Sequence, residues 1–233
     1  PIVAADISMY SRFSLKLFLA CLILFGQAAH ADSERRYLPK GSVDIKALVE
    51  PPPAQGSAAF EAEMAVVLWM QRTRTEAQIE FVQRTLNVDT FAPFLGSKLF
   101  AVDAALLKST IDDVIDEVRA EYDALKESYD VPRPFQVNPE VKPVTEWRAV
   151  KSFPSGHSVR AIIYARLLGE VFPESRDDMV AHAMQIGYGR VLAGVHFPGD
   201  VLAGQQLGHA FADVILRQDA FRSALTKVGH PQG

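Results

Sequence analysis

The sequence has no surplus of positive charge: 24 Lys and Arg against 28 Asp and Glu give a net charge of −4 and a pI near 5.9. Because there is neither a basic patch nor a nucleic-acid-binding motif, no nucleic-acid polymer is expected as a partner. Any anion that the protein binds must instead be held by a local group of residues. The sequence also lacks alternating apolar and polar stretches and hairpin signals, which excludes an extensive β-sheet.

Cysteine and long hydrophobic runs are almost absent as well. One apolar run, Leu17–Phe25, follows two basic residues and precedes Ala29-His30-Ala31, a candidate cleavage site. This pattern predicts a secretory signal over residues 1–31, starting at Met9, and a periplasmic or secreted protein. A single membrane anchor is the alternative, although the run falls short of the about 20 residues that a spanning helix needs. The one cysteine, Cys21, lies inside the signal, so the mature chain forms no disulfide.

What remains predicts an all-α protein with one helical-bundle domain. Its 48% hydrophobic content suits a single core, and no later apolar run is long enough to span a membrane. Residues 32–56 are predicted as an extended, Pro-rich arm, because Pro51–Pro53 have no backbone N–H groups to donate within a helix. Residues 57–233 then form the helical domain. The oligomeric state is left open, a homo-oligomer included.

Periodic apolar residues and capping signals place the helices of this domain. Thr75 and Gln78 form a capping box, and Ser155 is a candidate N-cap. Pro198 suits the first position of a helix, and Gly194 suits a helix end. The predicted helices cover 57–74, 75–86, 97–109, 110–129, 156–171, 175–194 and 198–215.

Residues whose side chains could bind an anion or take part in catalysis occur in three clusters. Lys126 and Arg133 are seven residues apart across a helix end, and taken alone they suit a solvated surface better than a binding site. Pro154 to His157 begin a helix, whose unpaired N–H groups near Gly156 and His157 make a ready anion site, with glycine allowing close backbone approach.

The third cluster places Arg190 in the last turn of one helix, His196 in a connection and Asp200 in the first turn of the next. Asp200 can accept the N–H of one imidazole nitrogen and leave the other nitrogen a lone pair for attack. A structural histidine is the competing interpretation of His196 by itself.

Taken together, Lys126-x6-Arg133-Pro134, Pro154-Ser155-Gly156-His157 and Arg190-x5-His196-x3-Asp200 resemble the signature of the type 2 phosphatidic acid phosphatase superfamily, which includes vanadium haloperoxidases. The arm, with Gly56 to Phe60, looks like the start of bacterial class A non-specific acid phosphatases. The resemblance implies a hydrolase acting on small phosphate monoesters, without a metal or other cofactor.

The resemblance also implies a role for each residue. Lys126, Arg133 and Arg190, with the Ser155 hydroxyl and the Gly156 and His157 backbone donors, would bind the phosphate. His196, oriented by Asp200, would attack phosphorus to give a phosphohistidine. His157 would protonate the leaving group and later activate water. An acidic pH optimum follows, since His157 must carry a proton and His196 must not.

One position departs from the family pattern, because Gly189 stands where a serine usually precedes the arginine. Several alternatives stay open: a lipid-phosphate phosphatase, a vanadium-dependent haloperoxidase with His196 as vanadate ligand, and a non-catalytic phosphate-binding relative. A metal site built from His157, His196 and Asp200 leaves the three cations unexplained. A serine hydrolase using Ser155 lacks the G-x-S-x-G elbow and its preceding strand.

Overall fold

A computed structural model describes residues 35–229, and the predicted signal over residues 1–31 lies outside them. Residues 37–229 form one unit that is built from helices and connections, with no strand in this part of the chain. The all-α prediction is therefore confirmed. In chain order the helices are α2 (Ile45–Leu48), α3 (Ala58–Thr73), α4 (Glu76–Gln83), η1 (Val88–Phe91), α5 (Ala92–Leu95), η2 (Gly96–Ala101), α6 (Ala104–Tyr129), α7 (Pro134–Val137), α8 (Gly156–Val171), η3 (Pro173–Ser175), α9 (Arg176–Leu192), α10 (Pro198–Ile215) and α11 (Asp219–Val228).

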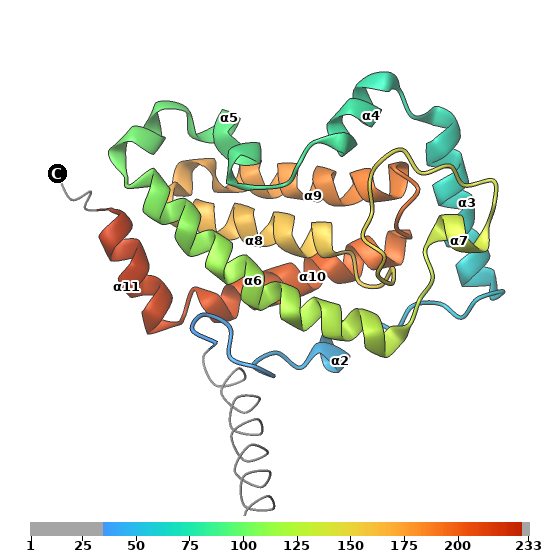
Figure 1. Ribbon diagram of the computed structural model, residues 1–233, viewed down its shortest axis with the longest axis horizontal. Helices are drawn as coiled ribbons and strands as arrows, with labels where there is room; N and C mark the ends of the chain where they lie inside the picture. The colour runs from blue at the N-terminus through green and yellow to red at the C-terminus, as the bar shows by residue number, and fades with distance from the viewer. Residues whose placement is uncertain (1–34, 230–233) are drawn as a thin grey trace, which may run out of the picture. The chain divides into compact units, whose positions relative to one another are not determined.

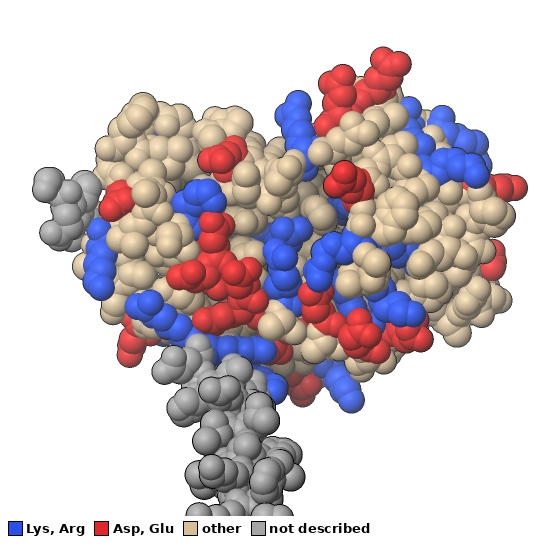
Figure 2. Space-filling model, viewed as in Figure 1, with Lys and Arg blue, Asp and Glu red and all other residues tan. Residues whose placement is uncertain are grey.

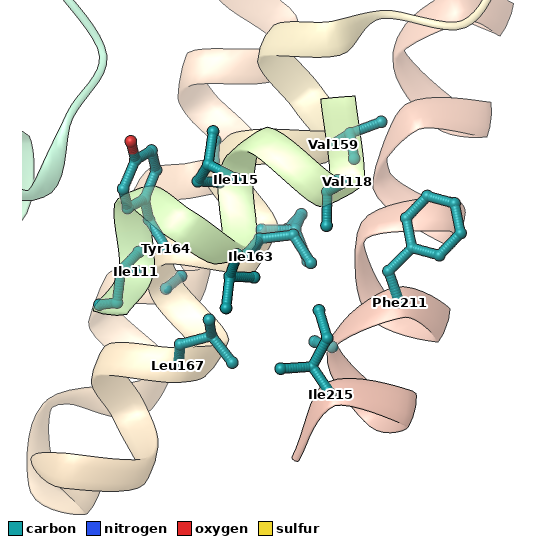
Figure 3. Close-up of a cluster of buried hydrophobic side chains, with 14 of the residues drawn as sticks. Ile111, Ile115, Val118, Val159, Ile163, Tyr164, Leu167, Phe211 and Ile215 are labelled. Atoms are coloured by element: carbon teal, nitrogen blue, oxygen red, sulfur yellow. The ribbon is translucent and has the colours of Figure 1, made fainter. Parts of the chain in front are cut away.

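Helix α8 is the centre of the core. It is apolar on nearly all sides, and a helix of that kind is stable in water only when other elements surround it. Helices α6, α9 and α10 pack around it (Figure 1). Figure 3 shows side chains from α6, α8 and α10 meeting, among them Ile115, Ile163 and Phe211. These three side chains are at most 3% exposed, so the N-terminus of α8 is held in a fixed place.

Helix α6 corrects one prediction. Two helices were expected, over 97–109 and 110–129, but a single 26-residue helix starts at Ala104, and a 3₁₀ segment over 96–101 precedes it. The Asp103 carboxylate accepts the Leu106 N–H at 2.9 Å and caps the helix there. No helix breaker stands near Thr110, and its buried side chain continues the apolar stripe.

The other predicted helix signals largely hold. Thr75 and Gln78 form the expected capping box, although α4 ends at Gln83 rather than near Leu86. Pro198 is the first residue of α10, and Gly194 follows the end of α9 with φ +76°. Helix α11 was missed, although its buried residues Phe221, Ala224 and Val228 recur at helical spacing.

The described part of the arm has one short helix, α2. Before this helix, Tyr37 and Leu38 of the arm are 2% and 1% exposed. The Glu117 carboxylate of α6 accepts their backbone N–H groups at 2.9 and 2.7 Å. Within residues 35–229, no helix is both long and apolar enough to cross a membrane.

Candidate active site

Six of the eight residues predicted from the sequence line one cavity of about 310 Å³. Figure 2 shows Lys and Arg side chains beside a hollow on the face that carries α4 and α6. The other two residues, Ser155 and Asp200, are buried next to the cavity lining, at 0% and 1% exposure. The six that line it are Lys126, Arg133, Gly156, His157, Arg190 and His196.

Lys126, in the last turn of α6, is buried beneath the loop that leads into α8. Its ammonium donates to the carbonyls of Lys151, Ser152 and Pro154 at 2.9, 2.9 and 2.6 Å. Burial and the charge of Arg133 lower the pKa of Lys126 to about 7. The three carbonyls favour the protonated form, because an ammonium has three protons to donate and an amine only two. Lys126 thus holds the loop in place, and its three ammonium protons are all donated to loop carbonyls.

Arg133 precedes α7 and spans the cavity floor. Its guanidinium donates to the Val150 carbonyl at 3.1 Å and to the Val195 carbonyl at 2.7 Å. One of its nitrogens, NH1, also lies 3.2 Å from His196 Nε2. Burial lowers the pKa of Arg133, but a guanidinium keeps its charge at any pH compatible with folding.

Arg190 enters the cavity from the last turn of α9. It donates to the Val82 carbonyl at 3.3 Å and to the Glu146 carbonyl at 3.5 Å. Its Nε is buried, and no described residue accepts its proton. Burial, with Arg133 and Arg160 nearby, lowers the pKa of Arg190 to about 10, so the side chain is a cation below that pH. An unpaired buried donor on a cation is costly unless an anion binds there.

The hydrogen bonds around His196 fix its tautomer. Arg133 has only donors, so His196 Nε2, 3.2 Å from it, must present a lone pair, and the proton lies on Nδ1. Nδ1 then donates to Asp200 Oδ2 at 3.1 Å. The same oxygen accepts the Ser152 hydroxyl at 2.5 Å and the Phe197 N–H at 2.9 Å. His196, which lines the cavity, therefore has an unprotonated Nε2 whose lone pair accepts from Arg133.

Burial controls the charge state of this pair. Desolvation, followed by the charges of Arg133 and Lys126, lowers the pKa of His196 well below its ordinary value, which keeps the imidazole neutral. Desolvation raises the pKa of Asp200, and its hydrogen-bond donors oppose that rise. With three donors on one oxygen, the carboxylate form of Asp200 is favoured.

The N-terminus of α8 forms the facing wall. Ser155 is the predicted N-cap, and its Oγ accepts the Ser158 N–H at 3.3 Å and the Ser158 hydroxyl at 2.9 Å. A Cβ on Gly156 would come within 2.8 Å of the Tyr122 ring, so glycine is needed there. The Gly156 and His157 N–H groups, which precede Ser158 in the first turn, have no acceptors within the helix and can face an anion.

His157, also in this first turn, borders the cavity. Desolvation and the charges of Arg190 and Arg160 lower the pKa of His157 well below its ordinary value. A bound anion would oppose those charges and raise that pKa.

Comparison with known proteins agrees with this architecture. The family model of the PAP2 superfamily matches residues 110–223, which hold all eight predicted residues. The chain carries a PAP2 superfamily domain. Over 237 residues it is 24% identical to a non-specific acid phosphatase of Salmonella typhi, covering 94% of this chain and 92% of that protein. The PAP2 superfamily domain and the acid phosphatase relative both support the conclusion that this protein is a phosphatase, which is a hydrolase.

Two solved structures share the fold of this PAP2 domain. A transmembrane PAP2 type phosphatidylglycerolphosphate phosphatase from Bacillus subtilis superposes with a TM-score of 0.52 at 22% identity, covering 87% of this chain and 93% of that one. A bacterial vanadium-dependent iodoperoxidase gives 0.60 at 17% identity, covering 75% and 52%. At these identities the likeness concerns the fold alone.

Gly189, the departure from the usual pattern, has a packing explanation in this PAP2 domain. A Cβ on Gly189 would lie 2.8 Å from Val82 Cγ1, and the Phe81 ring is the next neighbour at 3.7 Å. Without a side chain at 189, the end of α4 docks directly on α9. The Val82 carbonyl is then in place to accept from Arg190.

Sequence reasoning missed several cavity residues of the PAP2 domain. Ser152 contacts both His196 and Asp200, and its only sequence signal is a hydroxyl close before the Pro154 turn. Tyr122 and Arg160 line the cavity one helical turn from Lys126 and Gly156. Helical spacing from the motif residues would have pointed to both.

Proposed function

We propose that this protein is an acid phosphatase that hydrolyses phosphate monoesters through a phosphohistidine on His196. The observation that carries the proposal is the tautomer of His196, whose Nε2 lone pair lies 3.2 Å from the Arg133 guanidinium. A nucleophile must be unprotonated at the attacking atom, and an oriented carboxylate such as Asp200 stabilises the imidazolium character that develops.

The charges around the cavity suit a phosphoryl group. In phosphoryl transfer, negative charge spreads over three equatorial oxygens, so catalysis depends mainly on positioning and electrostatic stabilisation. Arg133 and Arg190 supply fixed cations, and Lys126 adds a third charge. The unpaired Nε of Arg190 and the first-turn N–H groups of α8 are the donors that a phosphate oxygen would satisfy.

The reaction then proceeds in two balanced steps. His196 Nε2 forms a bond to phosphorus as the ester P–O bond breaks, and His157 gives its proton to the leaving oxygen. Neutral His157 next takes a proton from water, the resulting oxygen bonds to phosphorus, and the N–P bond breaks to release phosphate. General acid–base help of this kind contributes about 10²–10⁴-fold.

A resident metal is not part of the proposal. A divalent cation would sit among Lys126, Arg133 and Arg190, whose charges repel it. The signal pattern within residues 1–31 supports export, so we further propose that the enzyme acts in the periplasm or is secreted.

Turnover of 4-nitrophenyl phosphate at mildly acidic pH in excess EDTA tests the reaction and its metal independence. We expect His196→Ala to abolish turnover, while His209→Ala, the same change on α10 at a residue that does not line the cavity, retains it. Equal activity of the His196→Ala protein would refute the assignment. Calorimetric phosphate binding without any turnover would favour a binding protein instead, and bromide oxidation by peroxide with added vanadate would favour a haloperoxidase.

A further inference from the structure

A second, mainly apolar cavity of about 390 Å³ adjoins the first. The two share part of their lining, including His157 and Arg190, whereas His196 borders only the first cavity. We name this second cavity the aromatic chamber. Its apolar lining residues are Phe81, Val82, Leu86, Pro93, Phe94 and Ile186.

Rings dominate one side of the aromatic chamber. The His182 imidazole has its centroid 5.7 Å from that of Phe81 and 5.1 Å from that of Phe94. All three side chains are half-buried and line the chamber, so part of each ring stays available to a ligand. Aromatic rings favour edge-to-face or offset contact with another ring, beyond the gain from apolar burial alone.

The chamber meets the first cavity at His157 and Arg190, and His196 does not border it. In an in-line displacement, the leaving oxygen lies opposite the attacking atom, His196 Nε2. His157 borders both cavities, so a proton from it reaches an oxygen at their junction. A group attached to that oxygen would extend into the chamber, away from His196.

We infer that the aromatic chamber binds the ring of an aryl phosphate and makes aryl phosphomonoesters the preferred substrate class. The inference rests on the proposed function for its catalytic part. The chamber volume accommodates one or two fused rings, and its partly exposed walls offer ring faces and edges rather than a narrow channel for a chain.

The test compares 2-naphthyl phosphate with ethyl phosphate in variants of the chamber wall. Ile186→Trp fills the chamber, and Met184→Trp, an equal change at an exposed position of α9, is the matched control. We expect Ile186→Trp to lower the naphthyl-to-ethyl ratio of kcat/KM by about tenfold, the size of effect expected when a hydrophobic pocket loses one or more contacts. Met184→Trp should leave that ratio unchanged. Comparing ratios cancels the intrinsic reactivity of the two esters.

A direct binding measurement separates this inference from the proposed function. Calorimetry with naphthylmethylphosphonate and methylphosphonate reports the chamber without any turnover. We expect the wild type to bind the naphthyl compound more tightly than methylphosphonate. This preference should be lost in Ile186→Trp and weakened in Phe94→Ser, which removes a ring without adding side-chain bulk to the chamber. Absence of ester hydrolysis with that preference retained would refute only the proposed function.

Three results would overturn the inference itself. Equal affinity for the two phosphonates would show that the chamber takes no ring. An unchanged naphthyl-to-ethyl ratio in both Ile186→Trp and Phe94→Ser would do the same. If kcat/KM relative to ethyl phosphate were higher for decyl phosphate than for naphthyl phosphate, the chamber would be a site for an alkyl chain.

Discussion

The two adjoining cavities are lined by a polar wall and an apolar wall, which are built differently. One wall, from residues 126–155 and 190–200, is polar, and backbone carbonyls and a carboxylate hold its buried side chains in place. The other, from residues 81–94, carries the apolar side chains of the aromatic chamber, and its Phe81 and Phe94 rings contact His182 of α9. The comparison suggests a division of work. Under the proposed function, the polar wall would perform the chemistry and the apolar wall would select what is attached to the phosphate.

The polar wall carries a thermodynamic cost that the apolar wall does not. Burying several cations lowers the pKa of Lys126 to about 7 and that of Arg190 to about 10. A phosphate dianion in the cavity offsets these costs, so the protein should bind anions tightly even though its net charge is negative. The apolar wall contributes through buried area, and loss of one side chain there weakens binding without stopping the reaction.

The largest expected effect on the polar wall comes from Asp200→Asn. An amide can donate to Nδ1 of His196 and place the proton on Nε2, which removes the attacking lone pair. We expect kcat to fall by about 10⁴-fold, the scale of the equivalent carboxylate-to-amide change in a serine protease triad. Steady-state kinetics check it, with circular dichroism to confirm folding and Asp213→Asn on the exposed face of α10 as control. A fall of less than tenfold would mean that Asp200 does not set the tautomer.

Next in size is Lys126→Met, which removes a charge and the three bonds that hold residues 151–154. Phosphate affinity should fall by about 10–100-fold, because a buried positive charge near the anion is lost. In the wild type, phosphate affinity should decline as pH rises above about 7, the pKa of Lys126 in the free protein. Calorimetry across that range measures both effects.

Lys108→Met, at an exposed position of the same helix, is the control and should bind phosphate like the wild type. A variant that loses affinity equally at pH 5 and pH 9 would show that the loop contacts, rather than the charge, are what matter. In that case, the role of Lys126 in the polar wall would be mainly structural.

The sequence predicts the polar wall well because its residues are recognisable by type and order. Lys126, Arg133, Arg190 and His196 all line the cavity, as the resemblance to the phosphatase signature implied. Ser152 was missed because a lone hydroxyl carries no signal until the loop is folded. The all-α class followed from the absence of strand signals in the sequence. Helix caps such as Thr75 were predicted at the correct residue.

The apolar wall was not predicted, for a physical reason. Residues 88–101 form short turns of 3₁₀ and α-helix, whose hydrophobic period is too brief to recognise. That Phe94 and His182 meet depends on how this segment docks on α9, a tertiary contact that no local pattern encodes. Residues 97–109 were assigned to a helix because the Asp103 cap was overlooked.

A smaller effect is expected where the two walls touch, at Gly189. Gly189→Ser places a side chain against Val82 and should lower the free energy of unfolding by about 1–3 kcal/mol, typical of overpacking. Combining it with Val82→Ala should recover much of that loss, since the alanine vacates the contact. Urea denaturation of the wild type, the single variants and the double variant measures the coupling. Additive losses would show that the clash is relieved by movement of α4 instead.

The smallest effect is a shift in pH dependence from Arg160→Met. Arg160 is one of the cations that lower the pKa of His157, after desolvation and Arg190. As the general acid, free His157 must be protonated, so kcat/KM falls as pH rises through its pKa. Removing the Arg160 charge raises that pKa, and the basic limb of the kcat/KM profile should move to higher pH. Arg166→Met, on the same helix and paired with Asp213, should leave the limb in place. If the limb stays fixed in Arg160→Met but moves in Lys126→Met, the group that titrates is Lys126, and His157 is not the acid that the free enzyme requires.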